Sequence, residues 1–433
     1  MLRITRTCRS ARPPEPGIAV SKRTYLRRLL LGVAGLAAIA IAGLEHRALS
    51  SIELDLEVAG SEPRVEIPWG GFAGRRLSAM VEANWRQNPE MAETFLARQL
   101  QRYPLDHSRW YTRAIVSRDL DRDPDLLRAH LGASVATQPG NREARWRAAT
   151  LSQLLGDADL AADHLRQWLH DQPGEAGQVL FAAGRWIHDP DELLDRVVPE
   201  GELYLSAVLR FARQHDRVDL APAAWARLPG PRPPGDNALL DFVDLVLGEG
   251  DYDAAMAAWR ETYPDYRPGQ VPNGDFVHPV GGGRGLDWDT RMPAGSQAMR
   301  DTRRFVSEPA SLRLEFDGKE TLRLSRPSVR IPVAANPDGW ILSGHWRGER
   351  LTTRALPYLD VRPGNGDRTR VDVPATTFDW TPFRVELDGA DEPALLHLQL
   401  RRDPSVHHFD RFLAGTLWLD ALRLEPRASA SLD

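Results

Sequence analysis

Helix-breaking residues recur at a nearly constant spacing through residues 75–267. Stretches with helical periodicity begin at Asn88-Pro89, Asp123-Pro124 and Gly156-Asp157, and their Asn or Asp positions lie 35 and then 34 residues apart. The prolines that end these stretches keep the same two spacings: Pro104, Pro139 and Pro173. A repeat of this length is a pair of helices, which buries its apolar face only by stacking on neighbouring pairs. The spacing therefore predicts a helical array over residues 75–267.

One stretch of this array resembles a known repeat. The run G-D-x3-A-x3-L-x7-P that starts at Gly156 is similar to the tetratricopeptide repeat, which has a period of 34 residues. A related run starts at Gly250, but its Pro264 comes early, and the stiff loop at residues 228–235 lies between the two. The resemblance implies three or four tetratricopeptide-like units that dock a protein partner of the cell envelope. The alternative is a generic helical array without true repeat packing.

An apolar run precedes the array. Residues 29–44 are uncharged, and a helix that starts at Leu26 would span about 28 Å of the ~30 Å bilayer core if Arg27 and Arg28 snorkel. Basic residues dominate the chain before this run, whereas acidic residues follow it. By the positive-inside rule, residues 26–46 are predicted to be a single transmembrane helix or signal anchor in the inner membrane. Residues 1–25 would then be cytoplasmic and the bulk of the chain periplasmic.

Other interpretations of this segment stay open. Ala40-Ile41-Ala42 matches an A-x-A cleavage pattern, so the segment could be a cleaved signal peptide, and Arg27-Arg28 faintly matches a twin-arginine signal. A buried soluble helix is the third interpretation. Residues 47–74 are expected to be a linker. The net charge of -5 excludes a general attraction to nucleic-acid phosphates, and the single cysteine, Cys8, cannot form an intrachain disulfide.

Beyond residue 268 the pattern changes to short alternating runs separated by turn residues. In the run at residues 311–316, three apolar side chains share one face and charged side chains share the other, as in a half-buried strand. Similar runs bring the expected total to about eight strands: 311–316, 329–333, 340–346, 358–361, 370–373, 383–387, 395–400 and 417–424. This pattern predicts a multidomain chain, α then β, with a β-sandwich at residues 268–428 and a short tail at 429–433.

Several landmarks in this region occur in a recognisable order. They are Asn273-Gly274-Asp275-Phe276, then Trp288, then L-S-G-H-W-R from Leu342, and finally G-T-L-W-L-D from Gly415. As an ordered set they resemble the landmarks of jelly-roll carbohydrate-binding modules over residues 270–426. The resemblance implies a jelly-roll fold and a polysaccharide ligand.

Aromatic rings offer flat apolar faces to the C–H surfaces of sugars, and arginines donate fixed hydrogen bonds to hydroxyl groups. The candidate carbohydrate-binding residues are Trp288, Trp346, Arg347, Arg350 and Trp380. The competing interpretation is that these residues serve packing. Trp418 is predicted to be core, because it shares the alternation of its strand with Leu422 and Leu424.

The same resemblance implies a structural calcium ion, held by an acidic residue after the opening landmark and by an aspartate of the final strand. Asp420 matches the second position. Val277 stands where the family commonly has Glu, so Asp275 or backbone carbonyls would have to replace that ligand. No other cofactor is expected.

The sequence contains no G-x-S-x-G, H-E-x-x-H or G-x-x-x-x-G-K-[ST] motif, so no catalytic residue is predicted. The expected function is that of an exported scaffold accessory to exopolysaccharide or envelope-glycan assembly and export. In this interpretation the array docks a protein and the sandwich binds a polysaccharide, by analogy of domain pairing. Two alternatives stay open: a carbohydrate-active enzyme with an unrecognised acid pair, and a purely protein-docking module.

Overall fold

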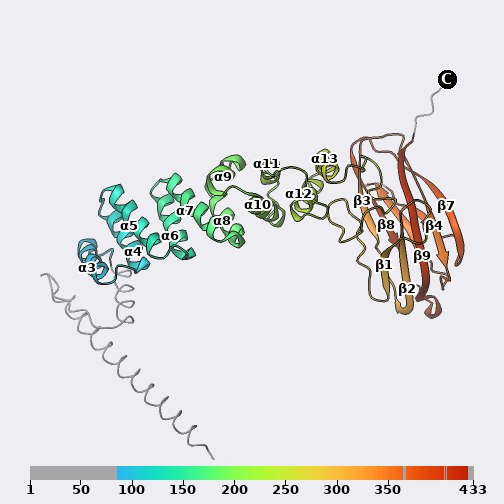
Figure 1. The fold of residues 1–433 in the computed structure, drawn as a ribbon, viewed down its shortest axis with the longest axis horizontal. Coiled ribbons are helices and arrows are strands. Elements are labelled where there is room, and N and C mark those ends of the chain that lie inside the picture. The colour runs from blue at the N-terminus through green and yellow to red at the C-terminus, as the bar shows by residue number, and fades with distance from the viewer. Residues whose placement is uncertain (1–84, 364–366, 404, 406, 428–433) are drawn as a thin grey trace, which may run out of the picture. The chain divides into compact units, whose positions relative to one another are not determined.

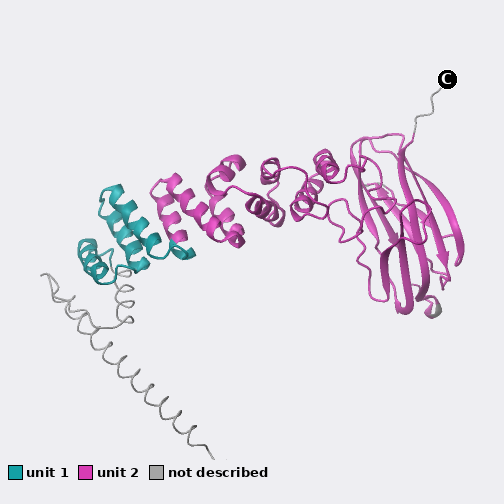
Figure 2. Cartoon of the chain, in the orientation of Figure 1, with its two compact units in different colours: residues 1–144 teal, residues 145–433 magenta. Residues whose placement is uncertain are grey.

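The computed structural model describes residues 85–363, 367–403, 405 and 407–427. The chain divides into two compact units, residues 1–144 and residues 145–433 (Figure 2). The division falls within helix α6 (Arg142–Leu154) and not between the helical residues and the strands. The predicted segments 1–25, 26–46 and 47–74 lie outside the described residues. Within the part of the chain that is described, no helix is long and apolar enough to cross a membrane.

The first unit contains the helices α3 (Pro89–Arg102), α4 (His107–Asp119) and α5 (Pro124–Thr137), followed by the start of α6. Two of the predicted breaks are helix starts. The Asn88 side chain accepts a hydrogen bond from the Met91 amide at 3.1 Å, and the Asp123 side chain accepts one from the Asp125 amide at 2.9 Å. A proline at the first helical position follows each cap, where its missing N–H costs no hydrogen bond.

The second unit continues with further helices, which are listed in chain order: α7 (Ala158–Asp171), α8 (Ala176–Ala183), α9 (Pro190–Val197), α10 (Glu202–Gln214), α11 (Leu220–Ala226), α12 (Asn237–Gly248) and α13 (Tyr252–Thr262). The two Gly-Asp runs start α7 and α13 in the same way. Gly156 and Gly250 have φ angles of +77° and +82°, and the aspartate after each glycine caps its helix. The local resemblance between the two runs is therefore confirmed as a shared turn.

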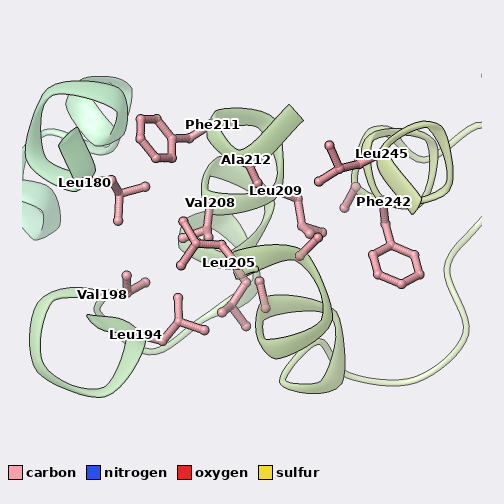
Figure 3. Close-up of a cluster of buried hydrophobic side chains, with 14 of the residues drawn as sticks. Leu180, Leu194, Val198, Leu205, Val208, Leu209, Phe211, Ala212, Phe242 and Leu245 are labelled. Carbon is pink, nitrogen blue, oxygen red and sulfur yellow. The ribbon is translucent and has the colours of Figure 1, made fainter. Parts of the chain in front are cut away.

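The helices of this unit bury a continuous apolar core. Leu205, Leu209 and Phe211 of α10 lie between Leu180 of α8 on one side and Phe242 of α12 on the other (Figure 3). Each of these five side chains is less than a tenth exposed. The helices α8, α10 and α12 thus bury their apolar faces against one another.

The sandwich contains nine strands in the described residues (Figure 1): β1 (Ser296–Asp301), β2 (Ser311–Thr321), β3 (Ser328–Val333), β4 (Trp340–Glu349), β5 (Tyr358–Pro363), β6 (Thr369–Asp372), β7 (Phe378–Leu387), β8 (Ala394–Arg401) and β9 (Phe412–Pro426). One sheet has the order β1-β2-β9-β4-β7 and the other β3-β8-β5-β6, and every pairing is antiparallel. The apolar faces of the two sheets form one core. The predicted order, a helical region followed by a β-sandwich, is confirmed.

The last helix pair is joined to the sandwich by ion pairs. Asp244 of α12 accepts hydrogen bonds from Arg330 of β3 at 2.5 Å, from Arg284 at 3.1 Å and from the Gly285 amide at 2.8 Å. Asp241, one turn earlier and 3% exposed, pairs with the same Arg284 at 2.5 Å. These contacts lie at the edge of the four-stranded sheet, since β3 is its outermost strand.

Strand β9 contains a bulge that changes which residues face the core. Ser343 and His345 of β4 are two residues apart, but they oppose Arg423 and Asp420, which are three residues apart. The extra residue is Ala421, with φ of +51°. Leu419 and Leu422 both point into the core as a result, and the residues before Ala421 alternate in the opposite phase from those after it.

Candidate functional site

The outward face of the five-stranded sheet gathers polar side chains from strands that are far apart in the sequence. The register of β1, β2, β9 and β4 aligns them in rows across the sheet. One row, called here the groove row, consists of Gln297, Glu315, Thr416 and Glu349. The next, called here the tryptophan row, consists of Met299, Arg313, Trp418 and Arg347.

Trp418 is at the centre of the tryptophan row, and arginines cover its ring. The guanidinium carbons of Arg304, Arg313 and Arg347 lie 5.1, 5.8 and 5.9 Å from the ring centroid. The indole Nε1 donates a hydrogen bond to Asp301 Oδ2 at 2.9 Å. Each cation lies at a distance typical of cation–π attraction. The ring is only 2% exposed, so it acts as a support that orders three guanidinium groups and not as an open platform.

A groove with a volume of about 730 Å³ runs along the groove row. Its walls include Gln297, Glu315, Thr416, Glu349 and Arg350. This volume is within the range of small-ligand sites, about 300–1,000 Å³. The lining offers carboxylate acceptors, a hydroxyl that both donates and accepts, and amide and guanidinium donors.

Ion pairs hold the carboxylates of the groove in place. Glu315 accepts a hydrogen bond from Gln297 and pairs with Arg313 in its own strand. Glu349 pairs with Arg304 at 2.5 Å, and this hydrogen bond holds the pKa of the Glu349 carboxyl below its ordinary value. Glycoside hydrolysis needs a carboxyl group whose pKa is raised, so that it can donate a proton. The lowered pKa does not suit Glu349 to the role of that general acid, and its carboxylate serves as an ionised acceptor.

Two of the predicted binding residues belong to the core. The Trp288 side chain is 1% exposed, packs against Phe276 and donates a hydrogen bond from Nε1 to the Pro272 carbonyl at 2.9 Å. The Trp346 side chain is 2% exposed and packs against Phe383 at 4.9 Å between ring centroids. Neither ring presents a face to a ligand. The prediction that they are exposed platforms is corrected on this point, because Trp346 alternates inward on β4 and Trp288 packs into the same core from a loop before β1.

The other predicted residues lie at the outward face or beside it. Arg347 is in the tryptophan row and pairs with Asp379 of β7. Arg350 is exposed, has a φ of +52° and lines the groove. Trp380 is half-buried on β7, at an irregularity in the pairing of β7 with β4. The structure therefore brings Arg347 and Arg350 near the candidate site, whereas Trp288 and Trp346 lie in the core of the sandwich.

The prediction that Trp418 is buried is confirmed, since the residue is 2% exposed. It lies on the outward side of the sheet beneath arginines and not on the side of Leu422 and Leu424, because the bulge at Ala421 reverses the phase of the strand. No sequence pattern marks the two outward-facing acids, Glu315 and Glu349, as residues of a binding site. Only the pairing of β9 between β2 and β4 brings them to either side of Thr416.

The residues present do not fit the implied calcium ion. Both oxygens of Asp420 are occupied by backbone donors, namely the amides of Val306 at 2.5 Å, Ser307 at 2.9 Å and Ala421 at 2.6 Å. Burial raises the pKa of the Asp420 carboxyl, which is unfavourable for a calcium ligand. Asp275 pairs with Arg423 at 2.8 Å, so a guanidinium neutralises this carboxylate. Among the described residues, no group of three or more acidic, His or Cys side chains could hold a metal ion.

No protein-family model matches the chain, and no curated protein matches it. Several solved structures do. The CBM22-1 xylan-binding domain of Xyn10C from Paenibacillus barcinonensis is 18% identical, with 36% of this chain and 94% of that domain covered, at a TM-score of 0.23. A family 16 carbohydrate-binding module is 14% identical, with 36% and 97% covered, at a TM-score of 0.24.

The pilF protein of Pseudomonas aeruginosa is 16% identical, with 45% of this chain and 92% of that protein covered, at a TM-score of 0.23. Every one of these TM-scores is below 0.5. The likenesses therefore carry no argument about what this chain binds, and the case for its function rests on the geometry of the outward face.

Proposed function

We propose that the outward face of the five-stranded sheet binds a polysaccharide, within a membrane-anchored scaffold that assists exopolysaccharide or envelope-glycan assembly and export. The groove over Glu315, Thr416 and Glu349 is the observation that carries this proposal. Each hydroxyl of a sugar both donates and accepts a hydrogen bond. A site for it therefore needs carboxylate acceptors next to guanidinium or amide donors, and the groove provides both.

The balance of charge on this face favours a neutral glycan over a polyanion. Arg304, Arg313 and Arg347 are each paired with a carboxylate, so little net positive charge remains to attract an acidic polymer. The same pairs fix the side chains before a ligand arrives. Less side-chain entropy is then lost on binding, which favours affinity in an otherwise shallow, polar site.

The helical array is proposed to dock a protein partner of the envelope. In the second unit, the large apolar side chains of Leu154, Phe181 and Leu203 are 68%, 65% and 62% exposed. These residues lie on the alternate helices α6, α8 and α10, and exposed apolar residues that recur along an array are suited to a partner's apolar side chains. The proposed anchor is the apolar segment 26–46, with residues 1–25 in the cytoplasm and the sandwich in the periplasm.

The test uses the full-length chain, purified in a mild detergent, in affinity electrophoresis and calorimetry against neutral and acidic polysaccharides, with the length of each glycan monitored. Glu349→Ala should weaken binding of a neutral glycan by roughly tenfold, the effect of losing one charge-assisted hydrogen bond. Gln297→Ala should weaken it severalfold, the effect of losing one neutral hydrogen bond. Glu386→Gln is the matched control, since this exposed carboxylate lies on β7 outside the groove and pairs with Arg427.

Saturable binding that fails in the two groove variants but not in the control supports the proposal. Shortening of a bound glycan would instead identify an enzyme. Absence of binding to every polysaccharide, by a protein that unfolds cooperatively, would overturn the proposal in favour of a protein-docking sandwich.

A further inference from the structure

A second cavity lies between the last helix pair and the opening loops of the sandwich, away from the groove. Its volume is about 120 Å³, several times the 10–15 Å³ or so that one water molecule needs. Trp259 of α13 and Tyr263, which directly follows that helix, form one wall, and Val271, Pro272 and Leu286 contribute apolar surface. The cavity is therefore large enough for a small organic molecule.

The Asp287 carboxyl lines this cavity and has no cationic partner among the described residues. Backbone N–H groups of Trp288 and Gly281 donate to it, the first at 2.7 Å. Burial raises its pKa to about 6, and the negative charge of Asp289 adds to this effect. A poorly solvated carboxylate without a cationic partner raises the free energy of the folded chain, and a bound cation would lower it again.

Three buried aspartates of this unit are neutralised by arginine. Asp241 pairs with Arg213 at 2.5 Å, Asp289 with Arg326 at 2.5 Å, and Asp360 with Arg368 at 3.3 Å. Asp420 is satisfied instead by three backbone amides. Asp287 is only partly buried, but its carboxyl faces a cavity in place of a guanidinium.

A second polar group lines the same cavity without a partner. The Tyr266 side chain is 7% exposed, and its hydroxyl has no hydrogen-bond partner among the described residues. A buried hydroxyl without a partner costs about 1–3 kcal/mol. Because this oxygen can accept a hydrogen bond, it complements the carboxylate as a second acceptor for an N–H group.

We propose that this cavity binds a small organic ammonium ion, with Asp287 as the counter-ion and Tyr266 as a second acceptor. The aromatic walls favour a cation because their electron-rich rings attract positive charge. The charged and titratable side chains that also line the cavity are Asp265, Arg267, Asp275, His278 and Arg423. Arg423 is engaged by Asp275 at 2.8 Å, which leaves Asp287 available to the ligand. This site is independent of the glycan groove.

The experiment is calorimetric titration of the full-length chain at pH 7.5 with ethylammonium, choline and glucosamine, and with glucose as the neutral counterpart of glucosamine. At least one cation is expected to bind saturably, and glucose is expected not to bind at this site. Asp287→Asn should weaken cation binding at least tenfold. The matched control is Asp265→Asn, an exposed carboxylate at the same cavity, which should change binding less than twofold.

A second variant keeps the proposal testable if the first alters the loop. Tyr266→Phe removes only one oxygen and should weaken cation binding severalfold, while the neutral glycan still binds the groove. The proposal is overturned if none of the cations binds, or if Asp287→Asn binds them as well as the unmodified chain.

Discussion

Replacement of Asp287 by Asn should stabilise the protein at neutral pH and have little effect at low pH. The pKa of this carboxyl is about 6 in the folded chain against an ordinary value of 3.8, so folding disfavours its ionised form. A difference of about 2 pKa units, at about 1.4 kcal/mol per unit, is a cost of about 3 kcal/mol. Asn avoids this cost but gives up the hydrogen bond from Gly281, which is worth about 1 kcal/mol. The expected net gain is about 2 kcal/mol.

The sign of the pH dependence follows from the direction of this shift. Below about pH 4 the carboxyl is mostly protonated in both states, so the variant and the unmodified chain should differ by less than about 1 kcal/mol. Between pH 4 and 6 the unfolded chain ionises first, and the stability of the unmodified chain falls relative to the variant. Above about pH 6 both states are ionised, and the difference reaches its plateau.

The assay is urea unfolding at pH 4, 5, 6, 7 and 8, followed by tryptophan fluorescence. The adjacent indole of Trp288 is buried and reports on this part of the sandwich. The difference in free energy of unfolding between the two proteins should increase from pH 4 to pH 6 and then stay constant. A difference that does not depend on pH would refute the reasoning, because it would show that the folded chain does not perturb the carboxyl.

Three further substitutions test the packing. Asp241→Ala should destabilise the protein by about 2–3 kcal/mol, because it removes the charge-assisted hydrogen bonds that Arg213 and Arg284 donate to a buried carboxylate, and chemical denaturation would contradict this if the midpoint were unchanged. Trp346→Ala should cost about 3–5 kcal/mol of stability whether or not a glycan is bound; intact stability with selective loss of glycan binding would show that this ring is a platform after all. Gly274→Ala should cost about 1–3 kcal/mol, because its Cβ would overlap a backbone carbonyl of β9, and normal thermal unfolding would refute that close approach.

Local chemistry explains why the helix starts could be predicted from the sequence. In Asn88-Pro89 and Asp123-Pro124, the Asn or Asp side chain accepts a hydrogen bond from an otherwise free backbone amide of the first turn. The proline that follows has no backbone N–H, so it adds no unpaired donor there. The strands with alternating apolar residues could also be predicted from local sequence. Successive side chains of a strand point to opposite faces, so a strand with one buried face shows an apolar residue at every second position. Strand β1 was missed. Its inward positions include Ala298 and Arg300, so it shows no apolar alternation, and it is held as an edge strand by its pairing with β2.

The candidate site could not be predicted because it depends on long-range pairing. A tryptophan in a strand packs inward or outward according to the phase of that strand, and one extra residue at Ala421 reverses the phase of Trp418. Trp288 and Trp346 have the residue type of a sugar platform, but their partners Phe276 and Phe383 come from other segments. The residue type therefore identified candidates, whereas the register decided which of them face outward.

The junction with the helices determines which face of the sandwich stays accessible within the second unit. Arg330 lies on the outward side of β3 and is held by Asp244 of α12, and Leu395 of β8 packs against the helical core. The helices thus cover part of the four-stranded sheet. The groove over Thr416 lies on the outward side of the other sheet, so a long polymer could bind there without meeting α12 or α13. The ammonium cavity lies on the helical side, where Tyr263 and Asp287 meet. A ligand in that cavity would therefore act on the junction and not on the groove.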